Sequence, residues 1–405
     1  ICMKLRKLAR QLAAAAVAGA MALSLCMPAL AQTWNISNGS HGFSKVYSVR
    51  VAASSGGRTV ELFGGGSSLS QTETDETVLS GSGATFISLR GYGAPVAVTL
   101  EGLDTKPEVS SPSDACIRTG GDVSVELRGT NTLTIPNRRC IDAEEGSLTL
   151  GGTGTLNIRS GHGIRMDDSF TLNSGIVDIA ETETSTKALQ SGITADTITL
   201  NGGRIHVSIA PPTSDYYYND ALSARKGIFI RGGSVVTKTA NTVSGADTVQ
   251  HRALYSRDGD IVISGGSVQA EGGELFAGGS IRISDGEVKA DALCSEKGLT
   301  ISGGKVTTKG FNVSGPIVLS GDAKVTFDGY LDEGPLSRFD LSGLTTDGYL
   351  RYQPDPLDTD AEKDSEGYVV IHGTLEPQPG GDAGNASGDA GGAIAAVVLG
   401  SAAVW

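Results

Sequence analysis

The sequence is poor in the residues that build disulfide-rich, collagen-like or nucleic-acid-binding proteins. Its 405 residues include 5 cysteines and 13 prolines, and aromatic residues make up only 5%. So few cysteines do not suggest a fold built from disulfides, and the absence of a Gly-X-Y period excludes collagen. The formal net charge is -13 and no basic block occurs, which argues against nucleic acid as a partner.

Residues 1–31 have the three parts of a cleavable secretion signal. A basic start precedes an alanine-rich apolar run at 12–25, and the small-x-small tripeptide at 29–31 makes Gln32 the first mature residue. Two alternatives are lipid attachment at Cys26, which lacks the small residue required before it, and a retained anchor, for which the apolar run is short. We therefore expect a secreted or cell-surface protein.

The other end carries a flexible linker and an apolar segment. Residues 377–392 are rich in glycine, alanine and aspartate, and residues 393–405 read AIAAVVLGSAAVW. Thirteen residues are too few to cross a bilayer. We interpret the segment as the start of a truncated anchor that attaches the protein to the cell wall or membrane. The alternative is a frayed apolar tail.

Between residues 96 and 325 one phrase recurs: an apolar dipeptide, a few polar residues, an alternating strand and a glycine turn. The 57 glycines of the chain, about twice the usual share, supply many of these turns. The last apolar residue before each turn recurs at intervals of 18 to 33 residues. These residues are Leu100, Leu127, Leu150, Leu172, Leu200, Ile230, Ile263, Ile283, Ile301 and Leu319. Such a period with variable insertions is typical of a solenoid.

The apolar residues of each phrase alternate, which indicates strands, and no window between 96 and 325 has convincing helical spacing. We predict an all-β fold: a single-stranded right-handed parallel β-helix of about ten coils, in which equivalent residues stack about 4.8 Å apart. The alternative is a string of β-sandwiches, which would not require one phrase at single-coil intervals. Residues 32–95 and 326–376 lack the phrase and are predicted to cap the two ends.

Three cysteines remain after the secretion signal. Cys116 and Cys140 occupy the same position in successive phrases, so the predicted stacking places them at a distance that a disulfide tolerates. Two alternatives stay open: a disulfide, which export would permit, or an inward ladder of two small thiols. Two positions further on, Arg118, Asp142 and Arg165 would form a ladder of alternating charge, which we interpret first as structural.

Acidic residues gather at the turn before successive strands: Asp122, Glu144, Glu145, Asp167, Asp168 and Asp196. If the coils align, these carboxylates lie along one edge of the rod, where oxygen ligands can hold calcium. The metal prediction concerns the middle four, Glu144, Glu145, Asp167 and Asp168. The alternative is a solvated acidic edge that keeps the protein soluble.

The insertion PPTSDYYYNDA between two phrases is aromatic and polar in a chain poor in aromatics. Three consecutive tyrosines cannot all be buried in a strand, and exposed rings can stack on sugar faces. The carbohydrate-binding prediction consists of Asp215, Tyr216, Tyr217, Tyr218 and Asn219. The alternative is a loop that packs over the coil edge.

Catalytic readings have less support. Gly161-His162-Gly163 matches a tripeptide of β-helix pectin hydrolases, but the paired aspartates follow the histidine instead of preceding it, and no Arg-x-Lys follows in place. His162 also occupies the phrase position of Arg139, as an ordinary turn residue would. For a lyase, Arg165 beside Asp167 is the one candidate, and no Ser-His-Asp arrangement is apparent in the sequence.

The repeated phrase, with LTISGG at 299 and ITLNGG at 198 preceded by Cys-Ile or Ala-Leu pairs, resembles the clostridial carbohydrate-binding domain family with a polysaccharide-lyase-like right-handed β-helix. The resemblance covers roughly residues 96–325. It implies a secreted or surface-attached, non-catalytic binder of polysaccharide, assisted by calcium. The Asp-Gly-Ile start of that family is replaced here by Ala-Cys-Ile, Arg-Cys-Ile and His-Gly-Ile, so none of its calcium positions is transferred. The alternatives are a structural or adhesive surface rod and a polysaccharide lyase or hydrolase.

Overall fold

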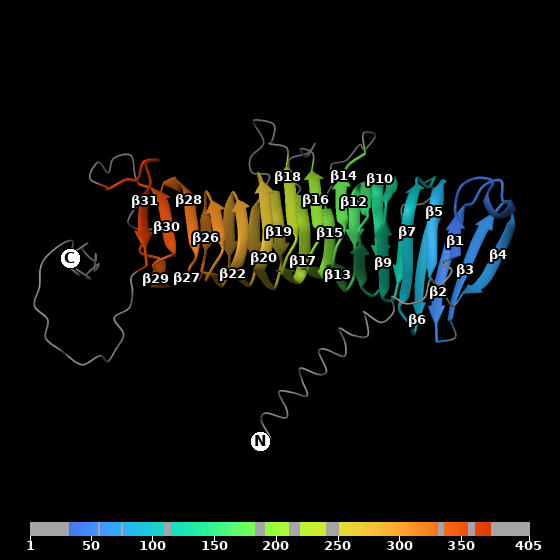
Figure 1. The fold of residues 1–405 in the computed structure, drawn as a ribbon, viewed down its shortest axis with the longest axis horizontal. Coiled ribbons are helices and arrows are strands. Elements are labelled where there is room, and N and C mark those ends of the chain that lie inside the picture. The colour runs from blue at the N-terminus through green and yellow to red at the C-terminus, as the bar shows by residue number, and fades with distance from the viewer. Residues whose placement is uncertain are drawn as a thin grey trace, which may run out of the picture.

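A computed structural model describes residues 32–55, 57–73, 76–108, 115–143, 145–182, 191–209, 219–239, 251–330, 336–354 and 361–373. The strands stack in one long row, with the N-terminal strands at one end and the C-terminal strands at the other (Figure 1). A short 3-10 helix, η2 (Ser40–Gly42), lies near the start. Within these residues no helix is long and apolar enough to cross a membrane. The predicted secretion signal, linker and apolar segment fall outside them.

Each coil contributes strands to three parallel sheets, named here in the order in which the chain visits them. The first sheet contains β2 (Ser48–Ser54), β6 (Phe86–Tyr92), β8 (Ile117–Gly120), β19 (His251–Ser256), β21 (Glu274–Ala277), β23 (Ala292–Ser295), β26 (Phe311–Val313) and parts of β10 (Thr130–Ala143), β12 (Thr155–Arg165), β15 (Ser191–Leu200) and β17 (Asn219–Ile230). Its strands begin the repeated phrases.

The second sheet holds the alternating strand of each phrase. It contains β1 (Gln32–Asn35), β9 (Val123–Arg128), β11 (Leu148–Gly152), β13 (Ser169–Leu172), β24 (Gly298–Ile301), β27 (Ile317–Gly321), β29 (Phe339–Leu344), parts of β5 (Thr77–Gly83), β7 (Val96–Thr105), β20 (Asp260–Glu271) and β22 (Ser280–Ala290), and the ends of β15 and β17.

The third sheet follows the glycine turn. It contains β14 (Ile176–Ala180), β16 (Arg204–Ile209), β18 (Ser234–Thr239), β25 (Lys305–Thr308), β28 (Lys324–Tyr330), β30 (Tyr349–Gln353) and the remaining parts of β5, β7, β10, β12, β20 and β22. Three parallel sheets visited in turn by every coil make a parallel β-helix, so the predicted fold class is confirmed.

The second sheet reproduces the predicted ladder with one exception. From Leu150 to Leu319 every predicted residue pairs with the next, and Leu100 pairs with Leu127. Between these stretches Leu150 pairs with Val125, because β11 continues through Gly151 and Gly152, and Gly152 pairs with Leu127. The period of the sequence therefore sets the stacking, while one glycine pair displaces the register by two residues.

The core is the stack of inward side chains from the three sheets. In the first sheet it runs through Ile117, Ile141, Ile164, Ile193 and Leu222, each at most 2% exposed. Burial of such a side chain stabilises the fold by about 1.5–3 kcal/mol. Because side chains alternate across a strand, the residue after each of these points outward.

The turn between the second and third sheets contains a stack of glycines. These are Gly203, Gly233, Gly266, Gly286 and Gly304, all at positive φ. A Cβ on any of them would lie 2.4–2.5 Å from the carbonyl oxygen of the stacked glycine on the preceding coil, which for Gly203 is Gly175. Glycine adopts positive φ without strain, and because it has no Cβ it also lets neighbouring coils approach this closely. This explains the recurring Gly-Gly and Asp-Gly turns.

Antiparallel strands lie at both ends of the parallel stack. At the N-terminal end β3 (Gly57–Gly64) and β4 (Ser67–Glu73) extend the first sheet, and at the other end β31 (Val369–His372) pairs with β30. Trp34 is fully buried beneath the first cap and donates to Glu73 at 2.6 Å. The predicted caps also contribute coils, because β5 and β6 continue the parallel stacking.

Cys116 and Cys140 are both fully buried and are free thiols, which matches the thiol ladder of the two alternatives. Register places Ile141 over Ile117 and so stacks the two cysteines. Burial, together with the neighbouring Cys116 thiol, raises the pKa of Cys140. Equivalent positions hold Gly163, Gly192 and Ala221, and a Cβ on Gly192 would lie 2.8 Å from Val207 Cγ1. The corner of the core thus has room only for small side chains.

Candidate functional site

The outward side chains of the first sheet form a continuous row along the rod, which we call the outer ladder. It consists of Arg50, Ser88, Arg118, Asp142, Arg165, Thr194, Ser223, Tyr255 and Phe276. Each residue is in register with the next, and all are half-buried or exposed. A polymer that lies along this sheet would therefore meet one polar or aromatic side chain per coil, about every 4.8 Å.

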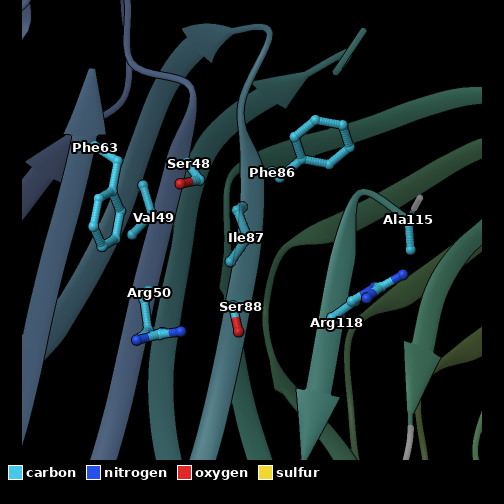
Figure 2. A pocket seen from close by; sticks show the side chains of 9 residues that line it. All are labelled: Ser48, Val49, Arg50, Phe63, Phe86, Ile87, Ser88, Ala115 and Arg118. Carbon is cyan, nitrogen blue, oxygen red and sulfur yellow. The ribbon is translucent and has the colours of Figure 1, made fainter. Parts of the chain in front are cut away.

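The N-terminal end of the outer ladder borders a hollow of about 240 Å³. Figure 2 shows the rings of Phe63 and Phe86 on either side of Ser48, with Arg50 and Arg118 at the opposite margin. The rings are half-buried, and Arg50 is half-exposed beside Glu61 at 3.4 Å. Among the described residues that line the hollow, two carry guanidinium groups and none carries a carboxylate, in a chain whose net charge is -13.

The middle of the outer ladder is charged. Asp142 Oδ1 lies 3.5 Å from Nη1 of Arg165 and 3.5 Å from Nη1 of Arg139. Arg165 Nη2 also donates to Asp167 at 3.2 Å. Register places Arg118 on the other side of Asp142, so the predicted order of charges along the rod is confirmed.

The C-terminal part of the outer ladder is aromatic. The rings of Tyr255 and Phe276 are 5.6 Å apart, and the Arg252 guanidinium lies 3.5 Å from the centre of the Tyr255 ring. Arg252 is held by Asp220 through hydrogen bonds of 2.7 and 3.2 Å. Burial outweighs this pairing and raises the pKa of Asp220. Cys294 is in register with Phe276 on the next coil. Its thiol donates to Glu274, and burial raises the pKa of the Cys294 thiol to about 12.

The acidic edge is partly assembled. Asp122, Glu145 and Asp168, from successive coils, line a hollow of about 380 Å³ together with glycines. Asp167 is paired instead with Arg165, and Glu144 lies outside the described residues. In the part of the chain that is described, no three acidic, histidine or cysteine side chains are placed to hold a metal ion.

Asp196, the last residue of the predicted edge, is held by its neighbours. It accepts hydrogen bonds from Arg225 at 2.7 and 2.5 Å, and Lys226 Nζ lies 2.8 Å away. The hydrogen bond from Arg225 is the largest cause that lowers the pKa of Asp196 to about 2. This carboxylate therefore serves the turn between the first and second sheets.

Most of the predicted carbohydrate loop, Asp215 to Tyr218, lies outside the described residues. Asn219 is described, and it does not occupy a surface loop. It begins β17, is fully buried and pairs in register with His251 of the next coil. Among the described residues, neither polar atom of its amide has a hydrogen-bond partner. Asn219 therefore belongs to the wall of the coil and not to an exposed sugar contact.

His162 has the position that the phrase predicted, because it is in register with Arg139 of the previous coil. A different polar cluster lies on the outer surface of the third sheet, where Asp178 contacts both Arg159 and His206. Asp178 and His206 are 28 residues apart in the sequence. The sequence carried no signal for this cluster, because the periodicity aligned only the phrase residues and left the third sheet unaligned.

Comparison of the chain with family models, with curated proteins and with solved structures finds no match.

Proposed function

We propose that the protein is an exported β-helix that binds polysaccharide along the outer ladder. The observation that carries the proposal is the unbroken register of this row, with aromatic rings near both ends and charged or hydroxyl side chains between them. Rings stack on the apolar faces of sugars, while guanidinium, carboxylate and hydroxyl groups bond to sugar hydroxyls. The coil spacing is similar to the length of one sugar residue, so repeating units would meet repeating contacts.

The hollow of Figure 2 favours acidic sugars at the N-terminal end of the outer ladder. Guanidinium groups bind carboxylates through charge-assisted hydrogen bonds, which are about twice as strong as neutral ones. Two arginines beside two phenyl rings would hold a carboxylated sugar by its charge and by its ring face together.

The test is titration of the full chain with polygalacturonate, with its methyl ester and with neutral dextran. We expect saturable binding of polygalacturonate and weaker binding of the ester, which keeps the sugar and removes the charge. Each titration is repeated with calcium and with EDTA, since calcium assistance is a prediction of the sequence that has no metal site among the described residues. Absence of binding to all three polymers would refute the proposal.

Variants locate the site. Arg50→Gln with Arg118→Gln should weaken polygalacturonate binding about 10-fold or more, because each loses a charged hydrogen bond. Arg204→Gln is the matched control, since Arg204 is an exposed arginine on the third sheet. Equal losses in both proteins would show that the charge acts nonspecifically.

A surface rod is the second candidate function. It is favoured by the uninterrupted core and by the antiparallel strands that close both ends, because these features make a long, stable spacer without any ligand. A rod predicts no saturable affinity for any sugar in the titrations above.

A further inference from the structure

Asp178, His206 and Ser208 lie together on the outer surface of the third sheet. His206 Nδ1 is 2.5 Å from Asp178 Oδ1, and His206 Nε2 is 3.4 Å from Ser208 Oγ. Ser208 and His206 are two residues apart on β16 and so share its outward face, while Asp178 is in register with His206 on β14. All three side chains are half-buried, so the serine is open to solvent.

The surroundings fix the carboxylate of this group. Arg159 Nη2 donates to Asp178 Oδ2 at 2.6 Å, while Nη1 donates to the Asp178 backbone oxygen at 3.1 Å. Burial raises the pKa of Asp178, but the hydrogen bonds from His206 and Arg159 outweigh it and hold the pKa below its usual value. An ionised Asp178 accepts the Nδ1 proton and leaves Nε2 as the acceptor for the Ser208 hydroxyl.

The geometry points to a Ser208–His206–Asp178 triad that hydrolyses esters, an activity beyond polysaccharide binding. A nucleophile, a base within reach of it and a carboxylate that orients the base are the parts that acyl transfer requires. The contact of 3.4 Å between Ser208 and His206 is at the loose end of this geometry, as is common before substrate binds.

The reaction needs only the ester and water. Ser208 Oγ attacks the carbonyl carbon while its proton passes to His206 Nε2, and the carbonyl oxygen takes the negative charge. The bond to the alcohol then breaks, and His206 returns the proton to the leaving oxygen. Water, deprotonated by His206, attacks the acyl-serine, and the proton on His206 returns to Ser208 as the acid leaves.

Lys238 is in register with Ser208 on the following coil, and Glu271 is in register with Lys238 on the coil after that. Lys238 Nζ lies 3.9 Å from Glu271, so this exposed ammonium must turn back towards Ser208 to reach the developing oxyanion. An outward sheet surface favours a short acyl group, such as acetyl, carried by an extended polymer. We therefore assign O-acetyl esters as the substrate class.

The test uses the full chain with a fluorophosphonate probe, which labels activated serines, and with p-nitrophenyl acetate. Neither reagent contains sugar, so failure here is distinct from failure of the proposed polysaccharide binding. We expect one label per chain, mapped to Ser208 by peptide mass, and none in Ser208→Ala. His206→Gln should lower the labelling and hydrolysis rates about 100-fold or more.

Asp178 is a positioning residue, and its test separates orientation from folding. Asp178→Asn should slow labelling and change its pH dependence, because the amide no longer fixes the tautomer of His206, while circular dichroism remains unchanged. Ser320→Ala removes a half-buried serine from β27 of the second sheet, outside both proposed sites, and is the matched control, with labelling unaltered. Absence of labelling in the parent chain, or equal labelling in Ser208→Ala, would overturn the assignment.

For the substrate class, p-nitrophenyl acetate is compared with p-nitrophenyl octanoate, and acetate release from acetylated xylan is measured. Faster hydrolysis of the acetate ester and release of acetate from the polymer support the assignment. Equal or faster hydrolysis of the octanoate ester would exclude a preference for short acyl groups.

Discussion

The middle coils and the C-terminal coils have the same interior and different surfaces. Along the second sheet, Leu172, Leu200, Ile230 and Ile263 are 28 to 33 residues apart, whereas Ile283, Ile301 and Leu319 are 18 apart. All of these residues are at most 1% exposed. The core therefore requires no more than about 18 residues per coil, and the middle coils are longer than their core requires.

The additional residues are inserted at one corner. In the C-terminal coils the third-sheet part of β22 ends at Ala290 and β23 begins at Ala292, whereas in the middle coils β16 ends at Ile209 and β17 begins at Asn219. The same middle coils carry the Asp178–His206–Ser208 group and the Asp220–Arg252 pair. The C-terminal coils carry exposed pairs such as Lys305–Glu287. The buried or half-buried polar groups named here thus lie in the coils that are longer than the core requires.

The largest expected effect tests whether the two interiors are equivalent. Leu222 of the middle coils and Leu293 of the C-terminal coils are fully buried members of the same first-sheet stack. Replacement of either by alanine should lower the free energy of unfolding by about 2–5 kcal/mol, measured in urea. Leu69→Ala, at a position 38% exposed on β4, is the control and should cost little. A large loss of unfolding free energy in only one of the two leucine variants would show that the two interiors are not equivalent.

The glycine stack gives a smaller effect of the same kind. Gly233→Ala and Gly304→Ala should each destabilise the protein by at least about 1–3 kcal/mol, because alanine is strained at positive φ and its Cβ would clash with the preceding glycine. Gly66→Ala has the same strain and open space around it, so its cost should stay near 1 kcal/mol. Thermal unfolding of the three variants provides the measurement. If Gly66→Ala destabilised the protein as much as the other two variants, the close approach of the stacked glycines would contribute nothing to the destabilisation.

The smallest effect concerns the surface of the middle coils. In the folded protein the hydrogen bond from Arg225 is the main cause that holds the pKa of Asp196 at about 2, below its ordinary 3.8. The stability that this pairing gives is present above the ordinary pKa of 3.8 and is lost as the pH falls through the folded value of about 2. Urea unfolding between pH 7 and pH 2 should show this decline in the parent chain and a flatter profile in Asp196→Asn. Identical profiles would mean that solvent screens the pair completely.

The sequence by itself determined the stacking. Its alternating apolar residues and recurring glycine turns favoured a strand solenoid over a string of β-sandwiches. Its intervals predicted the register of the second sheet except between Leu127 and Leu150. The stacked cysteines and the Arg118–Asp142–Arg165 order also followed, because residues at equal phrase positions must lie on neighbouring coils.

Only the tertiary structure decided what the coils do with their outer surfaces. Insertions of different length separate the phrases, so sequence spacing could not show that Asp178 lies beside His206 or that Phe63 and Phe86 face one hollow. The tertiary structure also placed Asn219 in the wall of the coil. There it is fully buried and in register with His251, and it is not exposed in a loop. The physical reason is that burial repeats with the period of the coil, whereas contacts between outward side chains depend on the register that each coil adopts after its own insertion.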